Sequence, residues 1–87
     1  MHVIADQVDM IATFMRHERP HPVRFRWEDR YGNVRVIRVE HITETTEEKV
    51  GGFAVFKYLC QSMIEGRERT YELRFMSKNA QWILYKY

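Results

Sequence analysis

The sequence predicts an α+β domain in which an N-terminal helix packs on a five-stranded, strongly bent antiparallel meander, similar to half of a barrel. Two patterns support this prediction. Apolar residues recur at spacings of three and four within residues 3–19, which is typical of an amphipathic helix. Between residues 22 and 87, segments of alternating polarity are separated by short turns, which is typical of hairpin-connected strands. The 87 residues suffice for a single domain, 1–87, and show no internal linker.

The predicted helix carries one apolar stripe, which consists of Ile4, Val8, Ile11 and Met15. Acidic residues near its start and basic residues near its end complement the helix dipole. Pro20 then ends it, because proline has no amide hydrogen to donate. The stripe is expected either to cover the sheet or to pair with a second copy of the chain, so its four residues are the candidates for self-association.

The first predicted hairpin follows the helix directly. Residues 22–27 alternate apolar and basic side chains, so Phe25 and Trp27 are expected to face the core. Residues 29–33 have the composition of a turn. The return strand, 34–40, changes parity halfway, and either a bulge in its middle or burial of both faces would account for the change.

Three further strands are expected at residues 53–64, 69–76 and 81–87. The first of them has apolar residues in both parities, which is typical of a central strand covered on two sides. The preceding segment, 43–50, is polar throughout. We expect a loop there, with a single helical turn as the alternative because its threonines and glutamates fit a capping box.

The composition gives no sign of a polyanion-binding protein and argues against a disulfide-bonded secreted protein and a membrane-spanning protein. The net charge is only +2, and 30% of the residues are charged, so no polyanion partner follows from charge alone. The single cysteine, Cys60, excludes an intramolecular disulfide and favours the reducing cytoplasm. The N-terminus lacks the pattern of a signal peptide, and no apolar stretch approaches the roughly 18 residues of a membrane span. We expect a cytoplasmic protein without a membrane partner.

No catalytic, cofactor or metal site is predicted. The four histidines and one cysteine are scattered and lack the paired spacing of a zinc site. Cys60 has no base placed beside it by any motif, and the glutamates lie in polar segments where nothing raises a carboxyl pKa. No glycine-rich phosphate loop is present. The sequence therefore favours a non-enzymatic protein.

A cluster of arginines on the first hairpin is the one feature of the sequence that indicates a possible binding function. Alternation, together with the bulge, places four guanidinium groups on one exposed face beside a tyrosine, and the candidate contacts with nucleic acid or another anion are Arg24, Arg26, Arg35, Arg38 and Tyr31. Guanidinium groups bind phosphates through charge and paired hydrogen bonds, and tyrosine offers a stacking surface for bases. In the alternative, acids across the sheet neutralise these arginines, and the candidate acids are Glu28, Glu40 and Glu72.

Four short motifs accompany this pattern. Residues 25–27 form F-x-W, residues 36–39 form V-x-x-V, residues 71–74 form Y-E-x-R and residues 82–84 form W-x-L. The combination resembles a group of small uncharacterised bacterial proteins, some of which occur alongside error-prone DNA polymerase genes. The resemblance spans residues 22–87, although the polar loop within that range departs from it. It implies a bacterial housekeeping or accessory protein and carries over no catalytic residue.

These observations predict a non-enzymatic protein-interaction or accessory domain of a bacterial cytoplasmic protein. Its partner would be another protein or a second copy, bound through the helix stripe or through an exposed edge strand at residues 81–87. The alternative is weak nucleic-acid binding through the arginine-rich sheet face.

Overall fold

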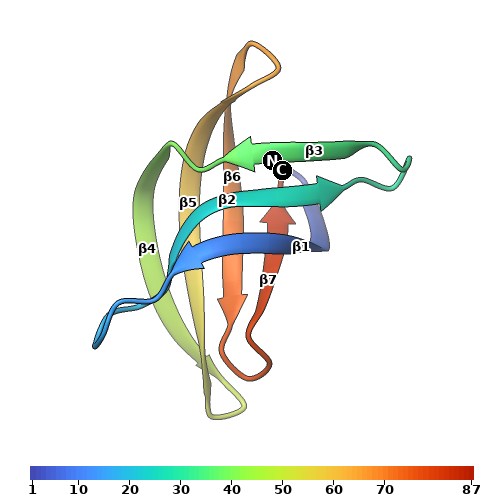
Figure 1. Ribbon diagram of the computed structural model, residues 1–87. Coiled ribbons are helices and arrows are strands. Elements are labelled where there is room, and N and C mark those ends of the chain that lie inside the picture. Colours follow the sequence, from blue (N-terminus) through green and yellow to red (C-terminus); the bar gives the residue numbers. More distant parts are fainter.

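A computed structural model describes all 87 residues and contains strands only. The strands, shown in Figure 1, are β1 (Val3–Thr13), β2 (His21–Glu28), β3 (Val34–Arg38), β4 (His41–Val50), β5 (Phe53–Ile64), β6 (Arg67–Met76) and β7 (Gln81–Lys86). They form one antiparallel seven-stranded sheet in the order β3-β2-β1-β7-β6-β5-β4. No helical segment with the length and apolar character of a membrane span is present.

The sheet bends into a half-barrel of two layers. In Figure 1 the layer of β1, β2 and β3 crosses in front of the layer of β4 to β7. β1 belongs to both layers, because residues 3–8 pair with β7 and residues 9–13 pair with β2. Its register with β7 shifts between Val3 and Asp6, where Ala5 has a φ of 50°. This irregularity lets one strand serve both layers.

The prediction of a helix at residues 3–19 is wrong. Residues 3–13 form β1, in which every second residue turns inward, with Val8 buried and Met10 partly buried. An isolated helix of this length has little stability of its own, whereas a strand here fills the position between β2 and β7 and satisfies both of their edges. Pairing with two neighbouring strands therefore stabilises residues 3–13 more than an isolated helix would, even though their apolar spacing fits a helix.

The polar segment 43–50 is neither a loop nor a helical turn, because it lies within β4. This strand pairs with β5 from His41 to Val50. Threonine favours extended structure, and most β4 side chains are exposed, so no hydrophobic period marks the strand in the sequence. The glutamates on this edge strand discourage a further chain from pairing with it.

Two other expectations about the strands are also wrong. β3 pairs with β2 in one unbroken register, so the predicted bulge near Val36 and Ile37 does not form. β7 is not an edge strand, since it lies between β1 and β6, and the edges of the sheet are β3 and β4. The strands expected near residues 22–27, 53–64, 69–76 and 81–87 are confirmed as β2, β5, β6 and β7.

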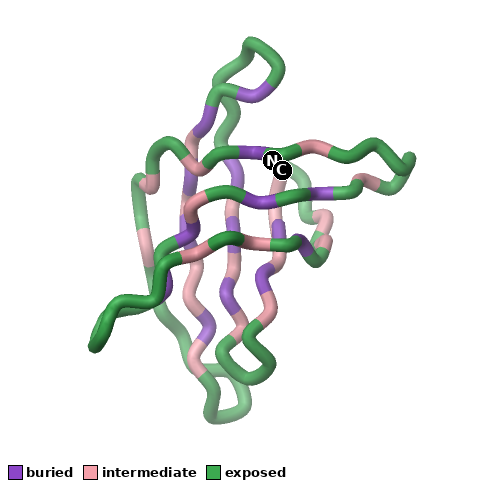
Figure 2. Tube along the Cα trace, viewed as in Figure 1, coloured by how far each residue is buried: buried purple, intermediate pink, exposed green.

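The core fills the space between the two layers, where Figure 2 shows the buried positions along the crossing parts of the strands. Phe25 and Trp27 are buried there, as the alternation in β2 predicts. Aromatic rings make up much of this core, with ring centroids 5.0 Å apart for Phe75 and Trp82 and 5.5 Å apart for Tyr58 and Trp82. Burial of such large rings is the main stabilising contribution available to a domain of this size.

A buried polar cluster closes the half-barrel where the end of β3 meets β5. The Ser62 hydroxyl donates to the carbonyl of Arg38 at 2.7 Å and accepts from the amide of Glu40 at 3.2 Å. The Tyr71 hydroxyl lies 2.6 Å from Ser62 and donates to it, because the single serine proton is already used. The Glu40 carboxylate accepts from the amide of Met63. The link between β3 and β4 is thereby held against β5.

Three buried groups make the fold sensitive to alkaline pH. Burial raises the pKa of Tyr58 and of Cys60 to about 12 each, and it raises the pKa of Tyr71 further still. The ordinary values are roughly 8.5 for cysteine and 10 for tyrosine, so above about pH 9 the unfolded chain releases protons that the folded chain retains. We expect the free energy of unfolding to fall steadily from about pH 9 to pH 12 in urea titrations followed by tryptophan fluorescence. An unchanged midpoint across that range would contradict the burial of these groups.

Candidate anion-binding site

The four arginines expected on one face are divided between two faces. Arg24, Arg26 and Arg38 point outward from β2 and β3, as predicted. Arg35 is opposite the buried Trp27 and turns toward the inside of the half-barrel. The missing bulge is the reason, because the unbroken register of β3 sends Arg35 inward and leaves its valine neighbours outside.

None of the acids proposed to neutralise these arginines forms an ion pair with one of them. Arg26 is 3.7 Å from Asp9 of β1, an exposed pair of the kind that contributes at most about 1 kcal/mol. Arg24 and Arg38 form no ion pair. Of the candidate acids, Glu72 pairs with Arg74 of its own strand at 2.6 Å, Glu40 binds the backbone of β5, and Glu28 forms no ion pair.

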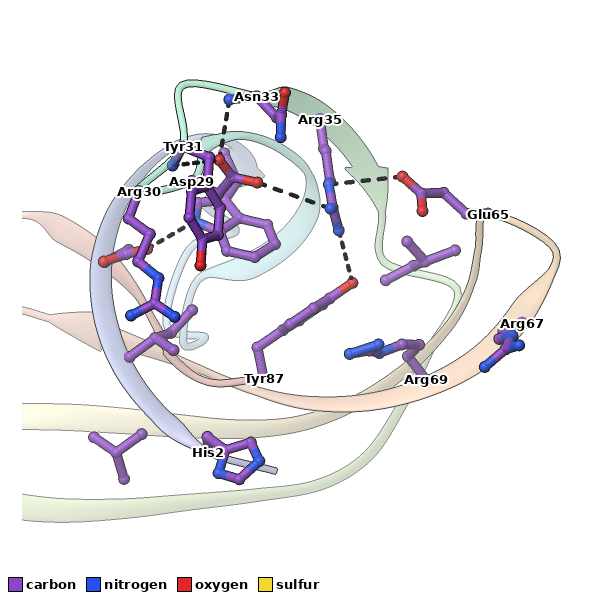
Figure 3. Close-up of a pocket in the computed structure, with 15 residues that line it drawn as sticks. His2, Asp29, Arg30, Tyr31, Asn33, Arg35, Glu65, Arg67, Arg69 and Tyr87 are labelled. Carbon is purple, nitrogen blue, oxygen red and sulfur yellow. Dashed lines mark hydrogen bonds and ion pairs between the residues drawn. The ribbon is translucent and has the colours of Figure 1, made fainter.

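The inward Arg35 leads to a pocket at the open end of the half-barrel, which Figure 3 shows in close-up. This mouth pocket has a volume of about 810 Å³ and is lined by His2, Val3, Ile4, Asp6, Trp27, Asp29, Arg30, Tyr31, Asn33, Arg35, Ile64, Glu65, Arg67, Arg69 and Tyr87. The β2–β3 and β5–β6 turns, the strands beside them, the start of β1 and the two ends of the chain contribute these residues. The volume falls within the usual range for small-molecule sites.

Arg35 is held in place from several directions. Its guanidinium group lies 3.8 Å from Asp29 and 3.6 Å from Glu65, and it donates to the Tyr87 hydroxyl at 3.3 Å. It also lies 5.4 Å from the centroid of the Trp27 ring, which adds a cation–π contact. With these partners, Arg35 builds the wall of the mouth pocket and has few donors left for a ligand.

The carboxylates of the mouth pocket are all engaged within the protein. Asp29 accepts from the backbone amides of Tyr31 and Asn33 at 2.9 Å and 3.0 Å. Partial desolvation acts to raise the pKa of Asp29, but these hydrogen bonds and the charge of Arg35 hold it below its usual value. Glu65 pairs with Arg35, and Asp6 accepts from the Trp27 indole at 2.9 Å.

Three guanidinium groups of the pocket, by contrast, have no carboxylate partner, and they are those of Arg30, Arg67 and Arg69. Arg69 lies 4.2 Å from the centroid of the Tyr87 ring, and Arg30 lies 5.2 Å from that of Tyr31. Cation–π contacts of this kind leave the N–H donors available. In Figure 3, Arg30 lies on one side of the pocket and Arg67 and Arg69 lie on the other. An anion between them would meet donors from both sides.

Aromatic rings line the same space. The rings of Trp27 and Tyr87 pack 4.7 Å apart at their centroids, and Tyr31 at the hairpin turn is 76% exposed. A mixture of aromatic surface and unpaired guanidinium groups suits a ligand that combines a flat ring with a phosphate.

The predicted self-association residues are not brought together. Ile4 lines the mouth pocket, Val8 is in the core, Ile11 is exposed on the outer face of β1, and Met15 lies in the β1–β2 loop.

No group of three or more histidine, cysteine or acidic side chains is arranged to hold a metal ion.

The sequence singled out Arg35 and Tyr31, which both line the pocket, but it placed Arg35 on the outer face, and it gave no indication of Arg30, Arg67 and Arg69. Arg30 lies in the β2–β3 turn, whereas Arg67 and Arg69 lie at the start of β6, so no local pattern connects them. The available signal was the pair of arginines directly after the β5–β6 turn, in a strand whose first residues have no apolar alternation. Comparisons with protein-family models, with curated proteins and with solved structures gave no match.

Proposed function

We propose that this domain is a non-enzymatic binding module whose mouth pocket holds a phosphate-bearing ligand. The observation that carries the proposal is that the acidic side chains of the pocket all have partners within the protein, whereas three of its arginines have no acidic partner. Its three carboxylates are satisfied by Arg35, backbone amides and an indole, while Arg30, Arg67 and Arg69 have no acid. Guanidinium groups that have no carboxylate partner recognise phosphate through charge and paired hydrogen bonds.

A nucleotide is the ligand class that fits both halves of the site. Its phosphate would lie between Arg30 of the β2–β3 turn and Arg67 and Arg69 of β6, and its base would contact the exposed ring of Tyr31. The pocket volume of about 810 Å³ leaves room for such a ligand.

The wider role that we propose is that of an accessory domain in the bacterial cytoplasm. A single buried cysteine is compatible with a reducing compartment. Homotypic association through a helix stripe or through residues 81–87 loses its basis, because the stripe residues are dispersed and β7 is paired on both sides.

Calorimetric titration at low salt tests the proposal with a nucleoside 5′-monophosphate, the same nucleoside without its phosphate, and inorganic phosphate alone. We expect the monophosphate to bind at least about tenfold more tightly than the nucleoside, because one charge-assisted hydrogen bond contributes roughly 1.5–3 kcal/mol. Added salt should weaken the monophosphate most. Equal binding of the nucleoside, or no binding of the monophosphate, would overturn the proposal.

A further inference from the structure

A second cationic feature lies on the outer face of the same hairpin. Arg24 of β2 and Arg38 of β3 are directly opposite each other in the register, and both are exposed. We name them the outer arginine pair. Like charges in this position destabilise a sheet by up to about 1 kcal/mol, and neither arginine forms an ion pair. The pair is therefore arranged to receive an anion from outside.

The neighbouring side chains extend this feature toward the mouth pocket. Arg26 shares the outer face and makes only the exposed contact with Asp9. Beyond it, the hairpin turn carries Arg30 and Tyr31 into the pocket. The nearest pocket residues on these strands, Trp27 and Arg35, lie roughly 10 Å along the hairpin from Arg24 and Arg38, but they face the inside of the half-barrel whereas the outer pair faces outward. A single nucleotide bound in the pocket cannot reach the pair.

We infer that the mouth pocket holds one nucleotide of a single-stranded nucleic acid, whose backbone continues over the outer face of the β2–β3 hairpin to Arg24 and Arg38. This inference rests on the proposed function. A polymer of phosphates is the ligand that occupies both features at once, and Tyr31, exposed at the turn between them, supplies a stacking surface for a base.

The shape of the site selects a single strand. A base enters the mouth pocket only when it is unpaired and unstacked, which a duplex does not allow without distortion. The arginines recognise the phosphate backbone, so the strand is defined by its charge and flexibility and not by its sequence.

Fluorescence anisotropy with labelled oligothymidylates of increasing length tests the inference. We expect the affinity to rise with length up to about four or more nucleotides and then to level off. The double variant Arg24→Gln/Arg38→Gln should remove this gain and reduce the slope of log K against log salt by about 1.4, which corresponds to two phosphate contacts. It should leave the affinity for the nucleoside monophosphate unchanged. The double variant Arg16→Gln/Arg19→Gln, in the β1–β2 loop, removes the same charge and should retain the length dependence.

The outcomes separate this inference from the proposed function. If the monophosphate binds but longer strands gain nothing, the outer pair has no such role and the pocket proposal stands. If the monophosphate fails to bind, the pocket proposal itself fails. Oligouridylates in parallel distinguish RNA from DNA, and a length gain in either series supports the inference. A duplex that binds as tightly as the single strand would overturn it.

Discussion

Replacing Arg30, Arg67 and Arg69 together by glutamine is expected to weaken the binding of a nucleoside monophosphate by at least about 100-fold. Each guanidinium contact with a phosphate contributes roughly 1.5–3 kcal/mol, and the loss of two such contacts already exceeds the 2.8 kcal/mol that corresponds to this factor. All three side chains are exposed and lack carboxylate partners, so the fold should lose little stability. Calorimetry measures the affinity, and thermal unfolding checks the fold.

A matched control removes the same charge at a distance from the pocket. The triple variant Arg16→Gln/Arg19→Gln/Lys49→Gln changes exposed residues of the β1–β2 loop and of β4, none of which lines the mouth pocket. With both triple variants compared at physiological salt, we expect it to bind the monophosphate within about threefold of the unmodified protein, because exposed charges separated by more than a Debye length of about 8–10 Å are then largely screened. An equal loss of affinity in both triple variants would show that net charge, and not the pocket, is responsible.

Replacement of Ser62 by alanine is expected to lower the free energy of unfolding by about 2–4 kcal/mol. The Ser62 hydroxyl serves the Arg38 carbonyl, the Glu40 amide and the Tyr71 hydroxyl at a site shielded from water. Its loss leaves these groups with fewer partners or none, and each unsatisfied buried group costs roughly 1–3 kcal/mol. A domain of this size has a total stability of only about 4–13 kcal/mol, so the variant is expected to be visibly weakened in urea unfolding.

Two further variants define the source of that loss. Ser77→Ala removes a serine hydroxyl from the exposed β6–β7 turn and should change the stability by less than about 0.5 kcal/mol. Tyr71→Phe removes only one member of the cluster and should cost less than Ser62→Ala. If Ser62→Ala were as stable as Ser77→Ala, the contact between β3 and β5 would not hold the half-barrel closed.

Sequence patterns predicted the parts of the fold in which local alternation and burial agree. β2 is the clearest case, since Phe25 and Trp27 face the core and the arginines between and beside them face solvent. β1 shows why the same method failed at the N-terminus. Every second residue of β1 faces inward, but the polar Asp6 is one of these inward residues and the apolar Ile11 lies on the exposed face. The strand therefore lacks the regular alternation of polarity that would reveal it in the sequence. Asp6 is turned inward because it accepts from Trp27, a contact that no local pattern reveals.

The candidate site was only partly predictable for the same reason. Arg35 was expected outside because its valine neighbours were expected inside, and the register reverses both. Its placement depends on partners far along the chain, with Tyr87 52 residues away. Arg67 and Arg69 reach the pocket only because the fold places the β5–β6 turn near the β2–β3 turn. Long-range contacts of this kind decide which charges are satisfied, and sequence periodicity does not record them.

The pocket at the open end of the half-barrel is tested most directly by recording amide resonances of the ¹⁵N-labelled protein during the nucleoside monophosphate titration. We expect the resonances of Arg30, Tyr31, Arg67 and Arg69 to shift together with one affinity, while those of β4 and of the β1–β2 loop stay in place. Shifts confined to β4 or to that loop, or an unchanged spectrum at saturating ligand, would contradict a phosphate site between the β2–β3 turn and the start of β6.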